Sequence, residues 1–83
     1  MRIRQPMKLE PTIVVAGTYA QGRSYIRARG LDSLRTRIVT SYIDALKAAA
    51  GRELDPGDVA FVGTWEELHE AVKISRFLEG RMK

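Results

Sequence analysis

A glycine-containing segment at residues 17–24 has most of the residue types of a phosphate-binding loop. It reads Gly-Thr-Tyr-Ala-Gln-Gly-Arg-Ser after an apolar run, which is the G-x-x-x-x-G-K-[ST] pattern with arginine in place of lysine. That chemistry needs N–H groups wrapped around a phosphate, a lysine on the terminal phosphates and a hydroxyl on magnesium. The planar Arg23 is a poor substitute, and no apolar run ends in a metal-binding carboxylate. The alternative is a helix that begins at Tyr19 and contains Gly22, which would make the match accidental.

A hydroxyl residue followed by an aromatic one comes shortly after each of three apolar β-branched runs, at 12–16, 37–39 and 59–62. Ligands of open parallel sheets bind at the carboxyl ends of the strands, where helix N-termini present free N–H groups. This edge is therefore the expected place for an anion or phosphate, unless the hydroxyls only cap helices and the aromatics only pack. The candidate ligand-binding residues are Thr18, Tyr19, Ser41, Tyr42, Thr64 and Trp65.

Positive charge is concentrated in the first half of the chain. The net charge is +4, and residues 1–37 carry eight of the fourteen Lys and Arg residues but only two acidic ones. Such a face suits nucleic acid or an acidic partner, or it is simply a solvated surface. Nothing in the spacing specifies base recognition, so a nucleic acid would be contacted mainly at its phosphates. The candidate contacts are Arg23, Arg27, Arg35 and Arg37, to which Arg2 and Arg4 could add.

The single histidine, His69, lies among Glu66, Glu67 and Glu70. A histidine–carboxylate couple could act as an acid and base, but carboxylates favoured by a helix dipole beside an exposed histidine are the preferred interpretation. The absence of cysteine excludes disulfides, zinc–cysteine sites and a cysteine nucleophile. We therefore expect no catalytic residue, no metal and no cofactor.

The spacing of the aromatics indicates the elements that position these residues. Tyr19, Tyr42 and Trp65 are 23 residues apart, which fits one strand, one helix and short loops per unit. The order βαβαβα predicts a small α/β domain, a Rossmann-like half domain. It has a three-stranded parallel sheet and helices on both faces. The strand order 2-1-3 places the most apolar run at the centre.

Capping residues mark the predicted helix ends. Thr64 with Glu67 forms a capping-box pattern. Further hydroxyl residues are expected to cap helix N-termini, and glycines are expected to end helices. They are Thr18 and Ser41 at helix starts and Gly30 and Gly51 at helix ends.

The third helix is expected at about 65–80, with one apolar face. Phe77 falls nearly opposite that face, so an exposed phenylalanine is predicted there, as a partner or oligomer contact or as an incidental surface residue. The residues predicted on the buried face are Leu68, Ala71, Val72, Ser75, Leu78 and Met82.

The chain of 83 residues is expected to form one domain over 12–83, preceded by a tail or short edge strand at 1–11. No apolar run approaches 18 residues and no signal-peptide pattern occurs, so a cytoplasmic location without membrane contact is expected. A three-stranded sheet leaves two unprotected edges, which favours a homodimer.

Three pieces, at 14–19, 38–41 and 58–65, are similar to short uncharacterised α/β proteins encoded by bacteriophages of actinobacteria. The resemblance covers about 12–72, and its signature is Gly-Thr-aromatic after the first and third runs. It transfers no activity and no site. It implies expression in a bacterial host, where many such products bind a host protein or a host nucleic acid.

Three functions are compatible with these observations. The preferred one is a non-enzymatic interaction module that binds and modulates a host protein. The alternative is a binder of nucleic acid or a phosphate ligand that uses the strand-end edge and the arginines. A degenerate nucleotide-binding protein related to the phosphate-loop pattern is the third.

Overall fold

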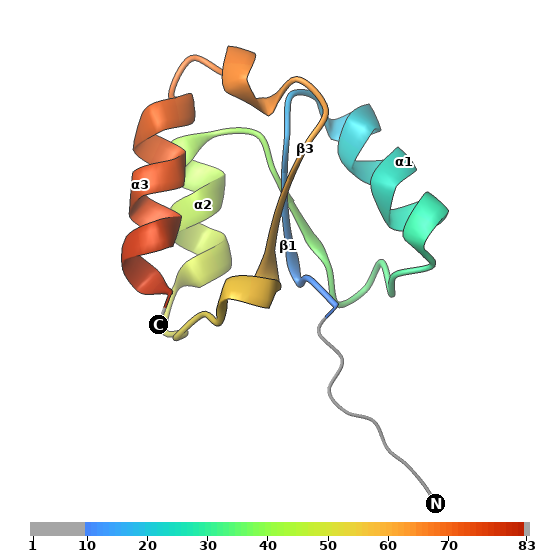
Figure 1. The fold of residues 1–83 in the computed structure, drawn as a ribbon, viewed down its shortest axis with the longest axis horizontal. Coiled ribbons are helices and arrows are strands. Elements are labelled where there is room, and N and C mark those ends of the chain that lie inside the picture. The colour runs from blue at the N-terminus through green and yellow to red at the C-terminus, as the bar shows by residue number, and fades with distance from the viewer. Residues whose placement is uncertain (1–9, 83) are drawn as a thin grey trace, which may run out of the picture.

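The computed structural model describes residues 10–82 and has a three-stranded parallel sheet with helices on both faces (Figure 1). The strand order β2-β1-β3 confirms the predicted order and fold class. The elements are β1 (Ile13–Ala16), α1 (Tyr19–Arg29), β2 (Arg37–Val39), α2 (Tyr42–Ala49), β3 (Val59–Val62) and α3 (Ala71–Arg81), with 3-10 turns η1 (Pro56–Asp58) and η2 (Trp65–Glu67).

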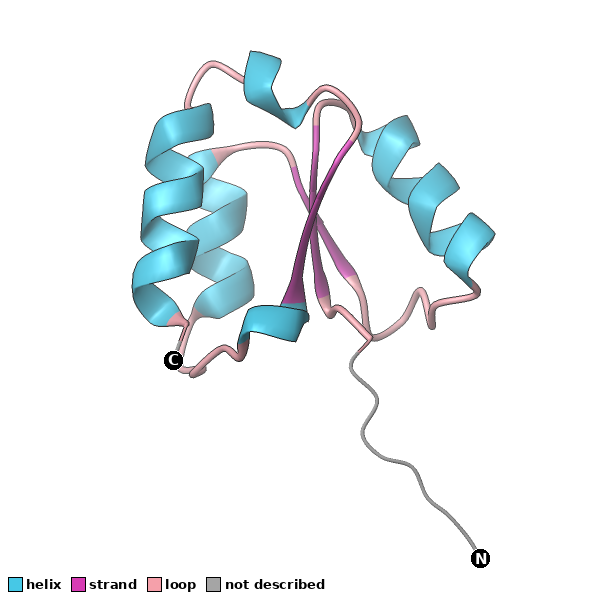
Figure 2. Cartoon of the chain, in the orientation of Figure 1, coloured by secondary structure: helices cyan, strands magenta, loops and turns pink. Residues whose placement is uncertain are grey.

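The central strand β1 is fully buried because helices cover both of its faces. Side chains alternate along a strand, so Ile13 and Val15 point to one layer while Val14 and Ala16 point to the other. Ile13 and Val15 join the main core beneath α2 and α3. Figure 2 shows these two helices on one side of the strands and α1 on the opposite side. This is the burial that continuous apolar β runs predict.

Helix α1 packs closely on the other face through a glycine. Only Gly22 and Ile26 of this helix are buried. A Cβ added at Gly22 would lie 2.7 Å from Cγ2 of Ile38 on β2. Gly22 therefore allows the helix to approach the sheet, and this is its structural role.

The first two helices begin and end where the capping residues predict. The Thr18 hydroxyl accepts a hydrogen bond from the N–H of Gln21, and the Ser41 hydroxyl accepts one from Asp44. Helix α1 ends at Gly30, whose φ of 67° is the left-handed conformation that glycine adopts without strain. Helix α2 ends at Ala49, two residues before Gly51, which also has a positive φ.

The third helix differs from its prediction. The N–H of Glu67 donates to the Thr64 carbonyl at 2.9 Å, which closes a single 3-10 turn instead of a capping box. Leu68 is then extended and packs against the core, so the chain changes direction and α3 begins only at Ala71. This break places α3 beside α2 (Figure 1).

The break also changes which side of the helix is buried. Phe77 is half-buried, and its ring meets the Tyr42 ring edge-on with 5.7 Å between centroids. Val72, predicted on the buried face, is 65% exposed. The predicted exposure of Phe77 is therefore wrong. The face of α3 that enters the core includes Ile74, which the sequence pattern left out, and Phe77 lies three residues further on the same side of the helix.

The prediction for 1–11 lies almost entirely outside the described residues, as do Arg2 and Arg4. Glu10 and Pro11 lead into β1 and belong to no strand. Within residues 10–82, no helix has both the length and the apolar character needed to cross a membrane.

Candidate functional site

At the carboxyl ends of β1 and β3, a glutamine side chain accepts the backbone N–H hydrogen bonds that a bound anion would need. Oε1 of Gln21 accepts hydrogen bonds from the N–H of Gly17 at 3.1 Å and the N–H of Thr64 at 3.0 Å. The Thr64 hydroxyl also lies within donating distance of the same oxygen, at 3.2 Å. Two of the backbone donors predicted to bind an anion are therefore satisfied within the protein.

The Gly-Thr-aromatic motifs after β1 and β3 serve this same contact. A Cβ on Gly17 would collide with Thr64, and a Cβ on Gly63 would collide with the Gln21 side chain. Gly63 also has a φ of 61°. Glycine is needed at both positions because two loops and one side chain meet there. The sequence analysis missed Gln21, since no local pattern marks a glutamine in the first turn of a helix.

The phosphate-loop interpretation of residues 17–24 is not supported by the backbone. Helix α1 begins at Tyr19, and the N–H of Gly22 donates to the Thr18 carbonyl at 3.2 Å as part of its first turn. A phosphate loop would need these residues wrapped around an anion before the helix starts. The alternative interpretation, a helix that contains Gly22, is confirmed.

Carboxylates occupy the start of α2. The N–H of Tyr42 donates to Oε1 of Glu70, and the N–H of Thr40 donates to Oδ2 of Asp44, both at 3.3 Å. These acids compensate the positive end of the helix and would repel a second anion. Glu70 is thus placed as a structural partner of α2 and not as a catalytic partner of the exposed His69.

The six strand-end candidates do not form one site. Tyr42 packs against Phe77 and lies under the Lys73 ammonium. The Trp65 ring instead packs at a tilt on Phe61, with 4.6 Å between ring centroids. Tyr19 is 61% exposed on the other side of the sheet. The start of α3 at Ala71 also removes one of the three helix N-termini that were expected at this edge.

Three of the four predicted arginines come together in a cleft between α1 and β2, which we call the arginine cleft. Its volume is about 780 Å³. Arg23 and Arg27 lie one turn apart on α1, and Arg37 reaches the cleft from the edge strand β2. The lining also includes Tyr19, Thr36 and Asp44.

The charges of this cleft are largely uncompensated. Within residues 10–82, no carboxylate forms an ion pair with Arg23, Arg27 or Arg37. Asp44 lines the cleft, but its carboxylate accepts hydrogen bonds from the N–H and hydroxyl of Thr40. The cleft therefore presents three guanidinium groups whose donors are available to an anionic ligand.

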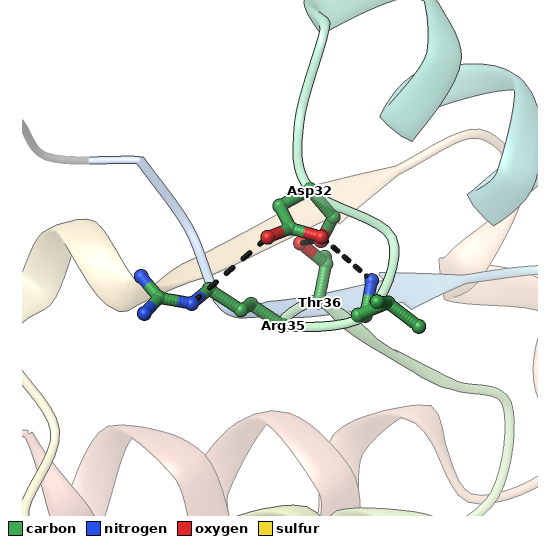
Figure 3. A network of polar contacts seen from close by, with 4 residues as sticks. Asp32, Arg35 and Thr36 are labelled. Atoms are coloured by element: carbon green, nitrogen blue, oxygen red, sulfur yellow. Dashed lines mark hydrogen bonds and ion pairs between the residues drawn. The ribbon is translucent and has the colours of Figure 1, made fainter.

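The loop between α1 and β2 forms the rim of the arginine cleft and is held by Asp32 (Figure 3). The Asp32 carboxylate accepts a hydrogen bond from the N–H of Leu34 at 2.9 Å. The backbone carbonyl oxygen of Asp32 accepts one from the Thr36 hydroxyl at 2.8 Å. Asp32 also lies 3.9 Å from the Arg35 guanidinium, a long and exposed ion pair that contributes little to stability.

Arg35 belongs to a second, adjacent cleft of about 490 Å³ on the α2 side of β2. Thr36 and Arg37 line both clefts, so the two adjoin at the start of the edge strand. Lys47 and Arg52 add two further cations. Arg52 donates to the Thr12 hydroxyl at 2.8 Å, which holds it in place.

In the described part of the chain, no three His, Asp or Glu side chains are grouped as a metal site would require. A comparison with protein-family models, with curated proteins and with solved structures gave no match. The resemblance to actinobacteriophage proteins therefore stays an expectation, and the functional argument depends on the geometry of the chain itself.

Proposed function

We propose that this chain is a non-enzymatic module that binds nucleic acid through its phosphates at the arginine cleft. The observation that carries the proposal is that Arg23, Arg27 and Arg37 converge on one cleft with no ion-pair partner among residues 10–82. Arginine presents a planar fork of donors that matches phosphate oxygens, and it is less strongly hydrated than lysine.

The energetic basis is the release of counterions from the nucleic acid. Each phosphate neutralised by an arginine frees condensed cations, and this favours binding most strongly at low salt. The repulsion among three unpaired guanidinium groups in the free protein is relieved at the same time. The asymmetric charge of the chain supports this, because the net positive charge lies on the segment that builds the cleft.

The proposal replaces the preferred interpretation from the sequence. The partner contact suggested for that interpretation was an exposed Phe77, and this ring is engaged with Tyr42 and the core. The nucleic-acid alternative needed the arginines to share a surface, and the cleft supports that requirement for three of the four candidates.

The test is fluorescence anisotropy of a labelled oligonucleotide over a range of salt concentrations. Each of Arg23→Gln, Arg27→Gln and Arg37→Gln is expected to weaken binding several-fold and to reduce the salt slope by about 0.7 to 0.9. Arg76→Gln is the matched control. Arg76 is an exposed residue of α3 that lies outside the arginine cleft and the adjacent second cleft, and its substitution removes the same charge.

Two results would contradict the proposal. If Arg76→Gln weakens binding as much as the cleft variants, attraction is a property of net charge and not of the cleft. If the wild-type chain shows no salt-dependent binding at low ionic strength, it is not a nucleic-acid module.

A protein partner is the second candidate, and the outer face of α2 favours it. Ile43 is 62% exposed, and Leu46 lies one turn further along the same face. An affinity pull-down from bacterial lysate after nuclease treatment, read by mass spectrometry, tests this candidate. It predicts one protein retained near stoichiometry and lost with Ile43→Ser, while the arginine variants retain it. Capture that disappears with nuclease supports the nucleic-acid proposal instead.

A further inference from the structure

We infer, on the basis of the proposed function, that the nucleic acid is single-stranded and follows the exposed edge of β2 through both clefts. One base stacks on the Tyr19 ring. Two observations support this inference: two adjoining basic clefts on either side of an edge strand, and an exposed aromatic side chain that lines one of them.

The path follows from the position of β2 in the sheet. In the order β2-β1-β3, no further strand among residues 10–82 covers the outer side of β2. The arginine cleft lies on the α1 side of this strand and the second cleft on the α2 side, and Arg37 lines both. A flexible backbone can pass from Arg23 around this edge to Lys47, with a cation available along the whole route.

The exposed tyrosine indicates an unpaired base. Tyr19 is 61% exposed and makes no ring contact with another residue among those described, whereas Tyr42 and Trp65 both pack on an aromatic neighbour. Base–aromatic stacking is the sequence-tolerant contact of single-strand-binding proteins. A base inside a duplex keeps its own stacking partners, so it is not available to this ring.

The shape of the surface also favours a single strand. Duplex readers insert a helix or a strand ribbon into a groove about 12 Å wide. Here the cations line two concave clefts of about 780 and 490 Å³, which are sizes typical of pockets for individual small ligands. Such clefts suit single nucleotides and their phosphates better than a rigid double helix.

Acidic groups mark where the path cannot continue. Asp44 and Glu70 occupy the start of α2, and both are held there by backbone N–H donors. Asp44 also lines the arginine cleft, so its charge would repel a phosphate from the part of that cleft beside the start of α2. The bound nucleic-acid strand is therefore expected to turn from the arginine cleft toward Lys47 and Arg35, away from the start of α2.

The experiment compares a single-stranded oligothymidine with a duplex of the same length, using the full chain and anisotropy at fixed salt. We expect the single strand to bind more tightly. Tyr19→Leu should weaken its binding about tenfold without changing the salt slope, and Tyr19→Phe should restore the affinity. Lys47→Gln should weaken binding of a ten-nucleotide strand but not of a three-nucleotide one. Arg76→Gln again serves as the control.

The outcomes separate this inference from the proposed function. Equal affinity for duplex and single strand, with the arginine variants still weakened, overturns the inference and leaves the proposed function standing. Unchanged binding by Tyr19→Leu does the same. Displacement of the oligonucleotide by an equal charge concentration of polyglutamate overturns both, because the clefts would then bind any polyanion.

Discussion

One glutamine determines how the two motif-bearing loops of this domain meet. The Gln21 oxygen lies where three donors from the β1 and β3 loops converge, and one of the two donor residues, Thr64, is 43 positions from Gln21 in the chain. A glutamine oxygen can accept these bonds without carrying a charge, so the site needs no bound anion for its hydrogen bonds to be complete.

We predict that Gln21→Met lowers the free energy of unfolding by about 1–2 kcal/mol. The variant keeps the length and helix propensity of the side chain but removes the acceptor, which leaves the N–H of Gly17 and the N–H of Thr64 without their partner. Urea denaturation followed by circular dichroism measures the change. Gln21→Glu retains an acceptor and is expected to stay close to the wild type; equal losses in both variants would contradict the role assigned to the oxygen.

A second prediction concerns Gly22, where two effects oppose each other. Alanine in a helix interior gains about 1 kcal/mol over glycine, but the added Cβ would press on Ile38 and overpacking costs about 1–3 kcal/mol. Gly22→Ala should therefore be destabilising even though the residue is helical. In an Ile38→Ala background the obstruction is absent and the same change should be stabilising. Thermal or urea unfolding of the four proteins tests this, and an identical effect in both backgrounds would show that Ile38 is not the cause.

At the scale of elements, the main event is the division of the expected third helix. The extended Leu68 separates the 3-10 turn from α3, and this allows Ile74 and Leu78 to enter the core beside α2. The same rearrangement brings Phe77 onto Tyr42 and leaves Val72 in solvent. The amphipathic pattern identified the helix and the burial of Leu78, but it placed the buried face too far toward Val72 and left out Ile74.

Phe77 and Val72, both on α3, should respond to the same substitution to very different extents. Phe77→Ser is expected to lower the free energy of unfolding by about 2–3 kcal/mol, because it removes a ring that packs on Tyr42 and the core. Val72→Ser should change it by less than about 0.5 kcal/mol at a position that is largely exposed. Denaturation curves of both variants check this. A near-neutral Phe77→Ser would mean that the ring is dispensable for packing and free to serve as a contact.

At the scale of the whole molecule, positive charge protects the β2 edge of the sheet from pairing with another copy of the chain, and the β3 edge has no such protection. The β2 edge is flanked by Arg35 and Arg37, and cations at an edge discourage pairing between copies. The four residues of β3 are half-buried and uncharged. The dimer expected from the sequence stays a prediction, and the charge distribution restricts it to β3.

We predict that a dimer, where it forms, pairs β3 with β3. The chain contains no cysteine, so a single introduced cysteine reports unambiguously on which edge is used. Ala60→Cys or Val62→Cys should cross-link under mild oxidation, and Thr36→Cys at the β2 edge should not. Sedimentation velocity gives the oligomeric state independently. Cross-linking through Thr36→Cys would contradict the pairing through β3, and a monomer at every concentration would contradict the expected dimer itself.

The sequence alone was sufficient for the architecture. Three apolar runs, three hydroxyl–aromatic pairs and the helix-terminating glycines predict the parallel sheet, its strand order and the caps at Thr18, Ser41 and Gly30. These features depend on the alternation of elements and on hydrogen bonds between residues three to five positions apart, which a linear pattern contains.

Only the tertiary structure decided the candidate site. Gln21 meets Thr64, Glu70 meets Tyr42, and Arg37 joins two arginines of α1, all across long separations in the chain. Whether a hydroxyl or an arginine faces a ligand or a neighbour depends on the distance and angle between packed elements. Local sequence patterns carry no information about those quantities. For this reason the predicted strand-end residues lie apart in the structure, whereas three of the predicted arginines line one cleft.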